Sequence, residues 1–553
     1  MTCPHREQSD VPANIIDLSQ LDYTKPKCPF KEGTCKLCQE VLEVEKDIKE
    51  TFEHLKGLVR RQQRLKTRTN NTHSPIIRDL PVEILSKIFY SCFSEEMTRD
   101  DGELAYEDVF VPLKVGAVCR TWRQVAWSSS ELWTTIFITR LYCAATYVCK
   151  QYPVLERWIE RSKSQPISVY VYEDATDGAN VGVVPEGCDC WETTLQLLAR
   201  CCDRWKNATL NLSKDSFKYI ASNLKLKSPT RRMELGSDER WLPNPNDRPL
   251  QLWEESDFGP DTITLNRPVL ICHFNIDWKH VTKVDVQGWP PGECINLLKS
   301  APQLVSCSFR EVGEYSRDSQ PEQDWPVVCH TSLRSLSFQC GLKPVNLFFD
   351  NITVPSLNEF NYSYVRGNNP AADTIINSSV LPSFFNRSHF PLTRLSLIVP
   401  ALTRDYLVSL LNLVPSLVHL SMHFSASFSR WDQKQVIDYF LEHLSSSAIF
   451  SVENGGDTNP LFLPQLETLE LESCSFNFPW SSLPDVFGYP SELGREGRRP
   501  LKSFVLGIRI PYVVRGLPED VVQRLVGLQE AGVSLNYRVR SAKGCSLVPV
   551  TWT

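Results

Sequence analysis

The side chains whose type and spacing come closest to known chemistry are cysteines near the start of the chain. Cys35 and Cys38 form a Cys-x-x-Cys pair, and Cys28 precedes it. A structural zinc site needs four ligands, which commonly come from two such pairs. The cysteines at 188–190 and 201–202 are too closely spaced to chelate easily, and the ten histidines are scattered. We therefore expect neither a metal site nor a redox pair.

Motifs that mark nucleotide-binding and hydrolytic enzymes are absent from the sequence. It has no Walker A or Gly-x-Gly-x-x-Gly loop, no His-Glu-x-x-His and no Gly-x-Ser-x-Gly. Such patterns supply the phosphate cradle, the zinc ligands or the activated nucleophile of the corresponding enzymes. His419 lies in an alternating apolar pattern and is interpreted as a strand residue, not as a catalyst. We expect no catalytic residue, no cofactor and no enzymatic activity.

Charge and hydropathy argue against two classes of partner. The 553 residues carry a net charge of −6, whereas a nucleic-acid-binding chain needs a basic face. No apolar stretch approaches the roughly 18 residues of a membrane span, and the polar N-terminus is unlike a signal peptide. We therefore expect no nucleic-acid partner, no membrane partner, reduced cysteines and a cytoplasmic or nuclear location.

A chain of this length predicts two or more domains, and its composition changes along the sequence. Residues 1–33 carry several prolines and little periodicity, which predicts a flexible leader. Residues 34–69 show a proline-free heptad pattern, which predicts a long helix. Its seam consists of Leu37, Val41, Val44, Ile48, Thr51, Leu55, Leu58, Gln62 and Leu65. The seam over residues 37–65 predicts either a homodimeric coiled coil or one helix that folds back on the next domain.

Residues 73–139 predict a small bundle of short helices. Pro81 suits the first position of a helix, and apolar residues follow with helical spacing at Leu80, Ile84, Leu85, Ile88 and Phe89. A charged insertion, Ser94–Phe110, is expected to be an exposed loop. A second apolar unit follows at 112–126, before a serine-capped turn and Leu132–Trp133. So small a bundle cannot bury all its apolar residues, and leftover apolar surface marks a partner site.

Residues 140–549 contain a recurring phrase of the form (Pro)-x-Leu-x-x-Leu-x-Leu. Its anchor residues are Val281, Leu304, Leu333, Leu357, Leu392, Leu417, Leu466 and Leu501. The final alternation predicts a short strand with one buried face, and segments such as Asp405–Leu413 and Gln433–Leu444 predict helices between strands. A repeated strand and helix is the unit of a solenoid. A non-repeating α/β domain would produce similar strands and stays an alternative.

The segment 73–139 resembles the F-box in three places. Ile77–Phe89 contains Leu-Pro-x-Glu-Ile-Leu, Val118–Ala126 contains Val-Cys-Arg-x-Trp, and Leu132–Trp133 follows. A looser similarity over residues 37–510 is to fungal F-box-like proteins, and it includes the phrases Leu155–Val169 and Cys202–Leu212. The resemblance implies an α+β fold with a small helical F-box bundle. A long heptad helix precedes this bundle, and an irregular leucine-rich-repeat-like α/β solenoid follows it.

The resemblance also implies a partner and contact residues. F-box helices pack on the Skp adaptor of a cullin ubiquitin ligase. The positions that match the family's contacts are Leu80, Pro81, Ile84, Leu85, Val118, Cys119 and Trp122. We interpret Ile88, Phe89 and Trp133 as internal core.

The function that follows is that of a substrate-recognition adaptor, which presents a protein target bound by residues 140–549 for ubiquitination. The insertion Ser94–Phe110 departs from the family pattern. It favours the alternative of a non-ligase scaffold or protein-binding module with a degenerate F-box. Arg495, Arg498 and Arg499 are too few to indicate recognition of a phosphorylated target. The target itself is not identified by the sequence.

Overall fold

The structure is a computed structural model, and it describes most of the chain. The described residues are 35–73, 80–92, 109–140, 151–173, 190–223, 230–237, 248–252, 259–266, 269, 271–313, 327–340, 346–364, 380–399, 403–424, 430–446, 461–472, 478–493, 498–508, 518–541 and 544–549. The predicted leader, 1–33, lies outside these residues, and so does residue range 94–108 of the insertion.

The chain forms two compact units. One comprises residues 1–85 and 119–122, and the other comprises residues 86–118 and 123–553. The boundary runs through the segment that was predicted as a helical bundle. Helices α3 (Val82–Ser91) and α6 (Arg120–Ser128) therefore each contribute residues to both units.

The first unit contains the long helix α1 (Lys36–His73). The helix was predicted from the heptad pattern over 34–69, and it continues to His73. Exposed ion pairs one turn apart, Lys46 with Glu50 at 3.8 Å and Lys56 with Glu53 at 2.7 Å, lie along its surface. Among the described residues, none of the helices combines the length and the apolarity that a membrane span requires.

The second unit begins with short helices and continues into a large sheet. Its helical start comprises the end of α3, α5 (Val111–Val118), most of α6 and the 3-10 turn η2 (Ser130–Trp133). Val109 is buried at 3% exposure and lies just before α5. Val109 therefore belongs to the core, whereas the next residue, Phe110, is exposed, so the prediction of an exposed loop over the whole of Ser94–Phe110 is wrong at Val109.

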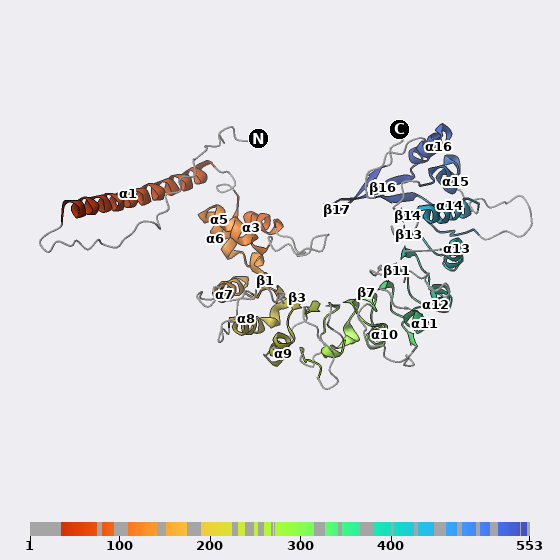
Figure 1. The fold of residues 1–553 in the computed structure, drawn as a ribbon, viewed down its shortest axis with the longest axis horizontal. Coiled ribbons are helices and arrows are strands. Elements are labelled where there is room, and N and C mark those ends of the chain that lie inside the picture. Colours follow the sequence, from red (N-terminus) through yellow and green to blue (C-terminus); the bar gives the residue numbers. More distant parts are fainter. Residues whose placement is uncertain are drawn as a thin grey trace, which may run out of the picture. The chain divides into compact units, whose positions relative to one another are not determined.

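Fifteen of the described strands form one sheet in the order of the chain, and two short strands between them form a separate pair (Figure 1). The strands are β1 (Thr135–Thr139), β2 (Ile167–Tyr172), β3 (Trp205–Asn211), β4 (Arg232–Gly236), β5 (Thr262–Leu265), β6 (Lys283–Gln287), β7 (Ser306–Val312), β9 (Ser335–Cys340), β11 (Glu359–Tyr364), β12 (Arg394–Val399), β13 (His419–Phe424), β14 (Thr468–Glu472), β15 (Ser503–Ile508), β16 (Ser534–Ser541) and β17 (Gly544–Pro549). Neighbours pair in parallel, except β16 and β17, which are antiparallel. β8 (Val328–Cys329) and β10 (Ile352–Thr353) form the separate parallel pair.

Helices follow most of the strands and pack on one another in chain order. They are α7 (Gln151–Ser162), α8 (Cys190–Ala199), α9 (Lys214–Asn223), α10 (Pro291–Ser300), α11 (Asn346–Asp350), α12 (Val380–Ser388), α13 (Arg404–Asn412), α14 (Arg430–Ser446), α15 (Leu483–Phe487) and α16 (Glu519–Glu530). Short 3-10 turns are η3 (Cys202–Arg204), η4 (Ile271–His273), η5 (Trp278–His280), η7 (Trp480–Ser482) and η8 (Pro490–Glu492). Figure 1 shows the labelled helices from α7 to α16 in a row along one side of the strands.

The recurring phrase of the sequence marks strands of the sheet. All eight anchor residues directly precede a strand from β6 to β15, and each is at most 4% exposed. The predicted helices are also present, as α13 and α14. The phrase does not extend to β1–β5, which continue the same sheet toward the N-terminus.

One face of the sheet is buried beneath the helices, because side chains alternate along each strand. In β9, for example, Leu336, Phe338 and Cys340 are buried while the residues between them are half-buried. Aromatic rings fill the space between strands and helices: Phe338 stacks on Phe348 at 4.5 Å between centroids, and Phe349 lies 5.1 Å from Phe384. The opposite face of the sheet carries the half-buried, mostly polar side chains.

Candidate protein-docking surfaces

Helix α3 separates its apolar residues into a buried stripe and an exposed stripe. Leu85 and Phe89, one turn apart, are each 1% exposed, whereas Ile84 and Ile88 are each 43% exposed. Val82, at the start of the helix, is 52% exposed. Two adjacent stripes at i, i+4 spacing give one broad apolar face in the sequence. Only one of them is covered in the structure.

The part of α3 from Ser86 onward belongs to the same compact unit as most of residues 109–133, and buried side chains and hydrogen bonds hold this helical start together. Trp133 is fully buried, and its indole Nε1 donates to the carbonyl of Ala126 at 2.8 Å. The Ser86 and Ser129 hydroxyls are hydrogen-bonded to each other. Val125 and Leu132 are also buried. This core fixes the position of the helices whose outer residues stay exposed.

The seven predicted contact residues divide by exposure. Pro81, Ile84 and Val118 are exposed, while Leu80, Cys119 and Trp122 are half-buried. Cys119 has a local role, because its Sγ accepts a hydrogen bond from the backbone N–H of Trp122 at 3.4 Å at the start of α6. Leu85 is buried, so its side chain is part of the core and not part of an exposed surface.

The predicted core also needs one correction. Phe89 and Trp133 are buried as expected, but Ile88 is exposed, so the prediction of an internal Ile88 is wrong. Exposed apolar residues that the sequence analysis did not select are Val82, Phe110 and Leu113. The i+4 spacing of Ile88 from Ile84 was the signal that places both on one stripe.

Tryptophans and one arginine join the helical start of the second unit to the first strands of the sheet. The guanidinium of Arg161, from α7, lies 4.6 Å from the ring of Trp127 and 4.5 Å from that of Trp133. Trp133 packs edge-on against Trp158 at 4.6 Å, and Trp158 donates to the carbonyl of Thr135 at 3.0 Å. Partial burial lowers the pKa of Arg161. These contacts tie α6 and η2 to α7 and β1.

The comparison with protein families concerns this helical segment. Residues 77–139 match the family model described as F-box-like. The match begins before α3 and ends with β1, so it contains α3, α5, α6, η2 and the exposed residues of α3. No curated protein matches the chain. The match supports the F-box resemblance of the sequence.

A second candidate surface is the face of the sheet opposite the helices. One row across this face, from β7 to β13, consists of small polar residues that lie side by side in register: Ser308, Ser337, Asn361, Ser396 and Ser421. The neighbours of these residues along each strand are mostly buried beneath the helices, so the row itself points away from the helices. The row therefore presents hydroxyl and amide groups to solvent in the middle of the sheet.

Charged residues flank this polar row at both ends. On the N-terminal side, Arg310 donates to Asp285 at 2.7 Å and to Asn266 at 3.3 Å. On the C-terminal side, Glu470 accepts from Arg538 at 2.8 Å and lies 3.9 Å from His419. The alternating sequence pattern predicts His419 as a strand residue, and it is the first residue of β13.

The His419 imidazole is biased toward its neutral form. Burial lowers its pKa, Arg394 and Arg538 act in the same direction, and the Glu470 and Glu359 carboxylates oppose them. His423, two residues along the same strand, lies 3.5 Å from Glu472. This end of the sheet face therefore combines the carboxylates of Glu470 and Glu472 with two imidazoles.

The remaining cysteines offer no reactive or metal-binding arrangement in the part of the chain that the structure describes. No group of three or more His, Cys, Asp or Glu side chains there could hold a metal ion. Cys35 and Cys38 lie at the start of α1, whereas Cys28 is outside the described residues. Burial raises the pKa of Cys294 and of Cys307, which keeps both thiols protonated.

Proposed function

We propose that this chain is a substrate-recognition adaptor of a Skp–cullin–F-box ubiquitin ligase. The observation that carries the proposal is the F-box-like match over residues 77–139. The exposed apolar side chains of α3 within that match support it, because such residues are the ones a partner covers. The chain would act by holding a target near the transfer machinery, and other subunits would supply the chemistry. We infer that the chain itself is not an enzyme and acts in cytoplasm or nucleus.

The residues proposed to contact the Skp adaptor are Pro81, Ile84 and Val118, with Leu80, Cys119 and Trp122 at their partly covered edges. The structure adds Val82 and Ile88 on α3, since both are exposed. Leu85 is left out because it is already buried.

The proposed target site is the polar face of the sheet, from β6 to β14. We infer that residues 140–549 form a leucine-rich-repeat-like solenoid; the parallel strands in chain order and the buried anchor before each phrase strand support this. The order of a long helix, an F-box-like segment and such a sheet also supports the wider similarity to fungal F-box-like proteins.

Adaptor capture tests the proposal directly. The full chain and an Ile84→Asp, Ile88→Asp variant would be used to capture the Skp adaptor. Both side chains are exposed, so the variant should fold. Two carboxylates buried in an apolar interface should weaken binding by at least about 3 kcal/mol, roughly 100-fold. Val305→Asp, which changes another side chain that is 40% exposed, is the matched control.

A second candidate function is a scaffold whose F-box-like segment does not engage the ligase. The insertion inside the F-box-like match favours it. Absence of adaptor capture by a wild-type chain with a native circular dichroism spectrum would support the scaffold and reject the ligase adaptor. Equal capture by the wild type and the double variant would reject the α3 surface.

We further propose that the chain forms a homodimer through the seam of residues 37–65. The seam residues of α1 support this, because Leu37, Val44 and Leu55 are each more than half exposed, at 73%, 57% and 54%. Exposed apolar residues at heptad positions are the contacts of a coiled coil.

A further inference from the structure

Charge is segregated along α1. Every acidic residue of the helix lies before His54, and every arginine lies after it. Helix–helix pairs with charged flanks select the orientation that brings opposite charges together. The segregation therefore carries information about how a second copy of α1 would lie against the first.

The seam defines which charged residues would flank the contact. With Val41, Ile48, Leu55 and Gln62 as position a and Val44, Thr51, Leu58 and Leu65 as position d, two other positions border the seam. Position g holds Glu40, Asp47, His54, Arg61 and Arg68. Position e holds Cys38, Glu45, Phe52, Val59 and Lys66.

The two orientations place these flanking residues against different neighbours. In a parallel pair, position g faces position e of the following heptad, so Glu40 would meet Glu45 and Arg61 would meet Lys66, both with like charge. In an antiparallel pair, g faces g. Glu40 would then meet Arg68 of the second copy, and Asp47 would meet its Arg61. All the charged g contacts become attractive.

The seam itself favours the same orientation. In a parallel pair, Thr51 and Gln62 would each face their own copy across the seam. In the antiparallel register set by the g contacts, position a packs against position d. Gln62 then lies opposite Val44, and Thr51 lies opposite Leu55. Each polar seam residue therefore shares its layer with an apolar one, and no layer has two polar members.

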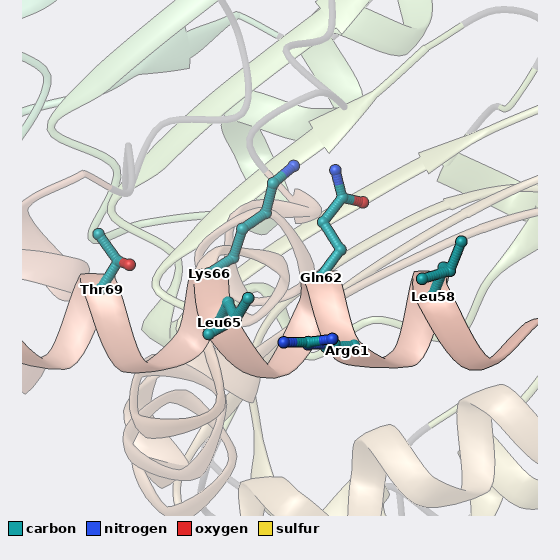
Figure 2. Close-up of a pocket in the computed structure, with 6 residues that line it drawn as sticks. All are labelled: Leu58, Arg61, Gln62, Leu65, Lys66 and Thr69. Atoms are coloured by element: carbon teal, nitrogen blue, oxygen red, sulfur yellow. The ribbon is translucent and has the colours of Figure 1, made fainter.

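A hollow on the C-terminal half of α1 matches this packing. It is lined by Leu58, Arg61, Gln62, Leu65, Lys66 and Thr69 (Figure 2). Leu58, Arg61, Gln62 and Leu65, at positions d, g, a and d, surround one hole that can receive a side chain of a facing helix. Gln62, Leu65, Lys66 and Thr69, at positions a, d, e and a, surround the next hole. The antiparallel register places Val44 and Val41 of the second copy over them. A parallel register would place Gln62 and Leu65 there.

We propose that α1 pairs with α1 of a second copy in antiparallel orientation, with Asp47 against Arg61 and Glu40 against Arg68. This rests on the homodimer proposed above and specifies its geometry. Since α1 rises about 1.5 Å per residue, the two His73 ends would lie about 60 Å apart. The F-box-like segment follows that end in each copy, so the two segments would be held at opposite ends of the pair.

Sedimentation equilibrium of the full chain with Arg61→Glu tests the orientation, because the two arrangements predict opposite signs. In the antiparallel pair the new glutamate faces Asp47, and the dissociation constant should rise by about 10-fold or more. In a parallel pair it would face Lys66 and strengthen the dimer. Arg60→Glu makes the same charge change at position f, away from the seam, and should leave the dissociation constant within about 3-fold.

A charge exchange sharpens the same test. Asp47→Arg and Arg61→Asp should each weaken self-association. Mixed together, the two variants should form a heterodimer about as tightly as the wild type pairs with itself, because both attractive contacts are restored. Circular dichroism checks that the helix content of each variant is unchanged.

Two results would overturn the antiparallel pairing, and only the second would also reject the homodimer. A dimer that tightens or does not change with Arg61→Glu would reject the antiparallel orientation and leave the homodimer standing. A wild-type chain that is monomeric at tens of micromolar would reject the homodimer as well, and would favour a helix that folds back on its own chain.

Discussion

The N-terminal helices and the sheet differ in the exposure of their apolar residues. Helices α1 and α3 leave isoleucines, leucines and valines exposed at contact spacing, whereas every phrase anchor of the sheet is buried and the outer strand face is polar. An apolar surface gains stability from almost any partner that covers it, but a polar surface binds only a partner that satisfies its hydrogen bonds. We therefore propose that the helices bind the same partners each time and that the sheet recognises a target selectively.

The largest effect expected from this comparison is on stability. Leu336→Ala removes a fully buried side chain from β9 and should destabilise the second unit by about 2–5 kcal/mol. Ile88→Ala removes a similar side chain from the exposed stripe of α3 and should change stability by less than about 1 kcal/mol. Urea unfolding of the two full-length variants measures both. Equal losses would show that Ile88 is part of the core.

A smaller effect concerns a buried charge inside the sheet region. Arg499 donates to the carbonyls of Phe462 at 2.6 Å, Leu463 at 3.1 Å and Leu444 at 3.2 Å, and burial lowers its pKa to about 10. Arg499→Leu removes the donor for all three and should cost about 2–4 kcal/mol in urea unfolding.

Arg538→Leu provides the matched control for this substitution. Arg538 is paired with Glu470 on the polar face, and its removal should cost less than about 1 kcal/mol. If the two arginine substitutions cost the same, the distinction between the inner and outer sides of the sheet would fail.

The smallest effect is a pH dependence at the polar face. Because the pKa of His419 is lowered from its ordinary value of 6.5, the unfolded chain binds this proton more tightly than the folded chain. Stability should therefore fall as pH drops through about 6.5, and the full penalty is reached below the folded pKa.

His419→Gln should reduce the loss of stability between about pH 7 and pH 5 by roughly 0.5 kcal/mol or less, because solvent screens this half-buried site. Urea midpoints across that range measure it. His280→Gln, at an exposed histidine, serves as the control. If His419→Gln does not change the dependence of stability on pH, the folded chain does not lower the pKa of this imidazole.

Some features followed from local sequence because their cause is local. The phrase anchors, the strands β6 to β15, α13 and α14, and the proline-free helix α1 all depend on spacing and on residue type within a short window. The strands β1–β5 lack the phrase, so the sequence contains no repeated pattern that marks them as members of the same sheet. Their pairing depends on backbone hydrogen bonds to neighbours distant in sequence.

The roles of single residues were harder to predict. Leu85 and Ile88 lie on adjacent stripes of α3, and periodicity alone does not say which stripe is covered. Arg498 and Arg499, considered as a possible phosphate cluster, instead donate to backbone carbonyls; Arg498 reaches Phe487 at 3.0 Å. These outcomes depend on which backbone passes nearby.

The sequence by itself determined the F-box-like segment, the heptad helix and the alternating strands, because each depends on residue types at short, fixed spacings. Only the tertiary structure decided that the strands join one mostly parallel sheet in chain order. It alone also decided which apolar stripe of α3 stays exposed, and that the outer sheet face is a polar row between charged ends. Burial and cross-strand register are set by contacts between residues far apart in the chain, and no local pattern contains them.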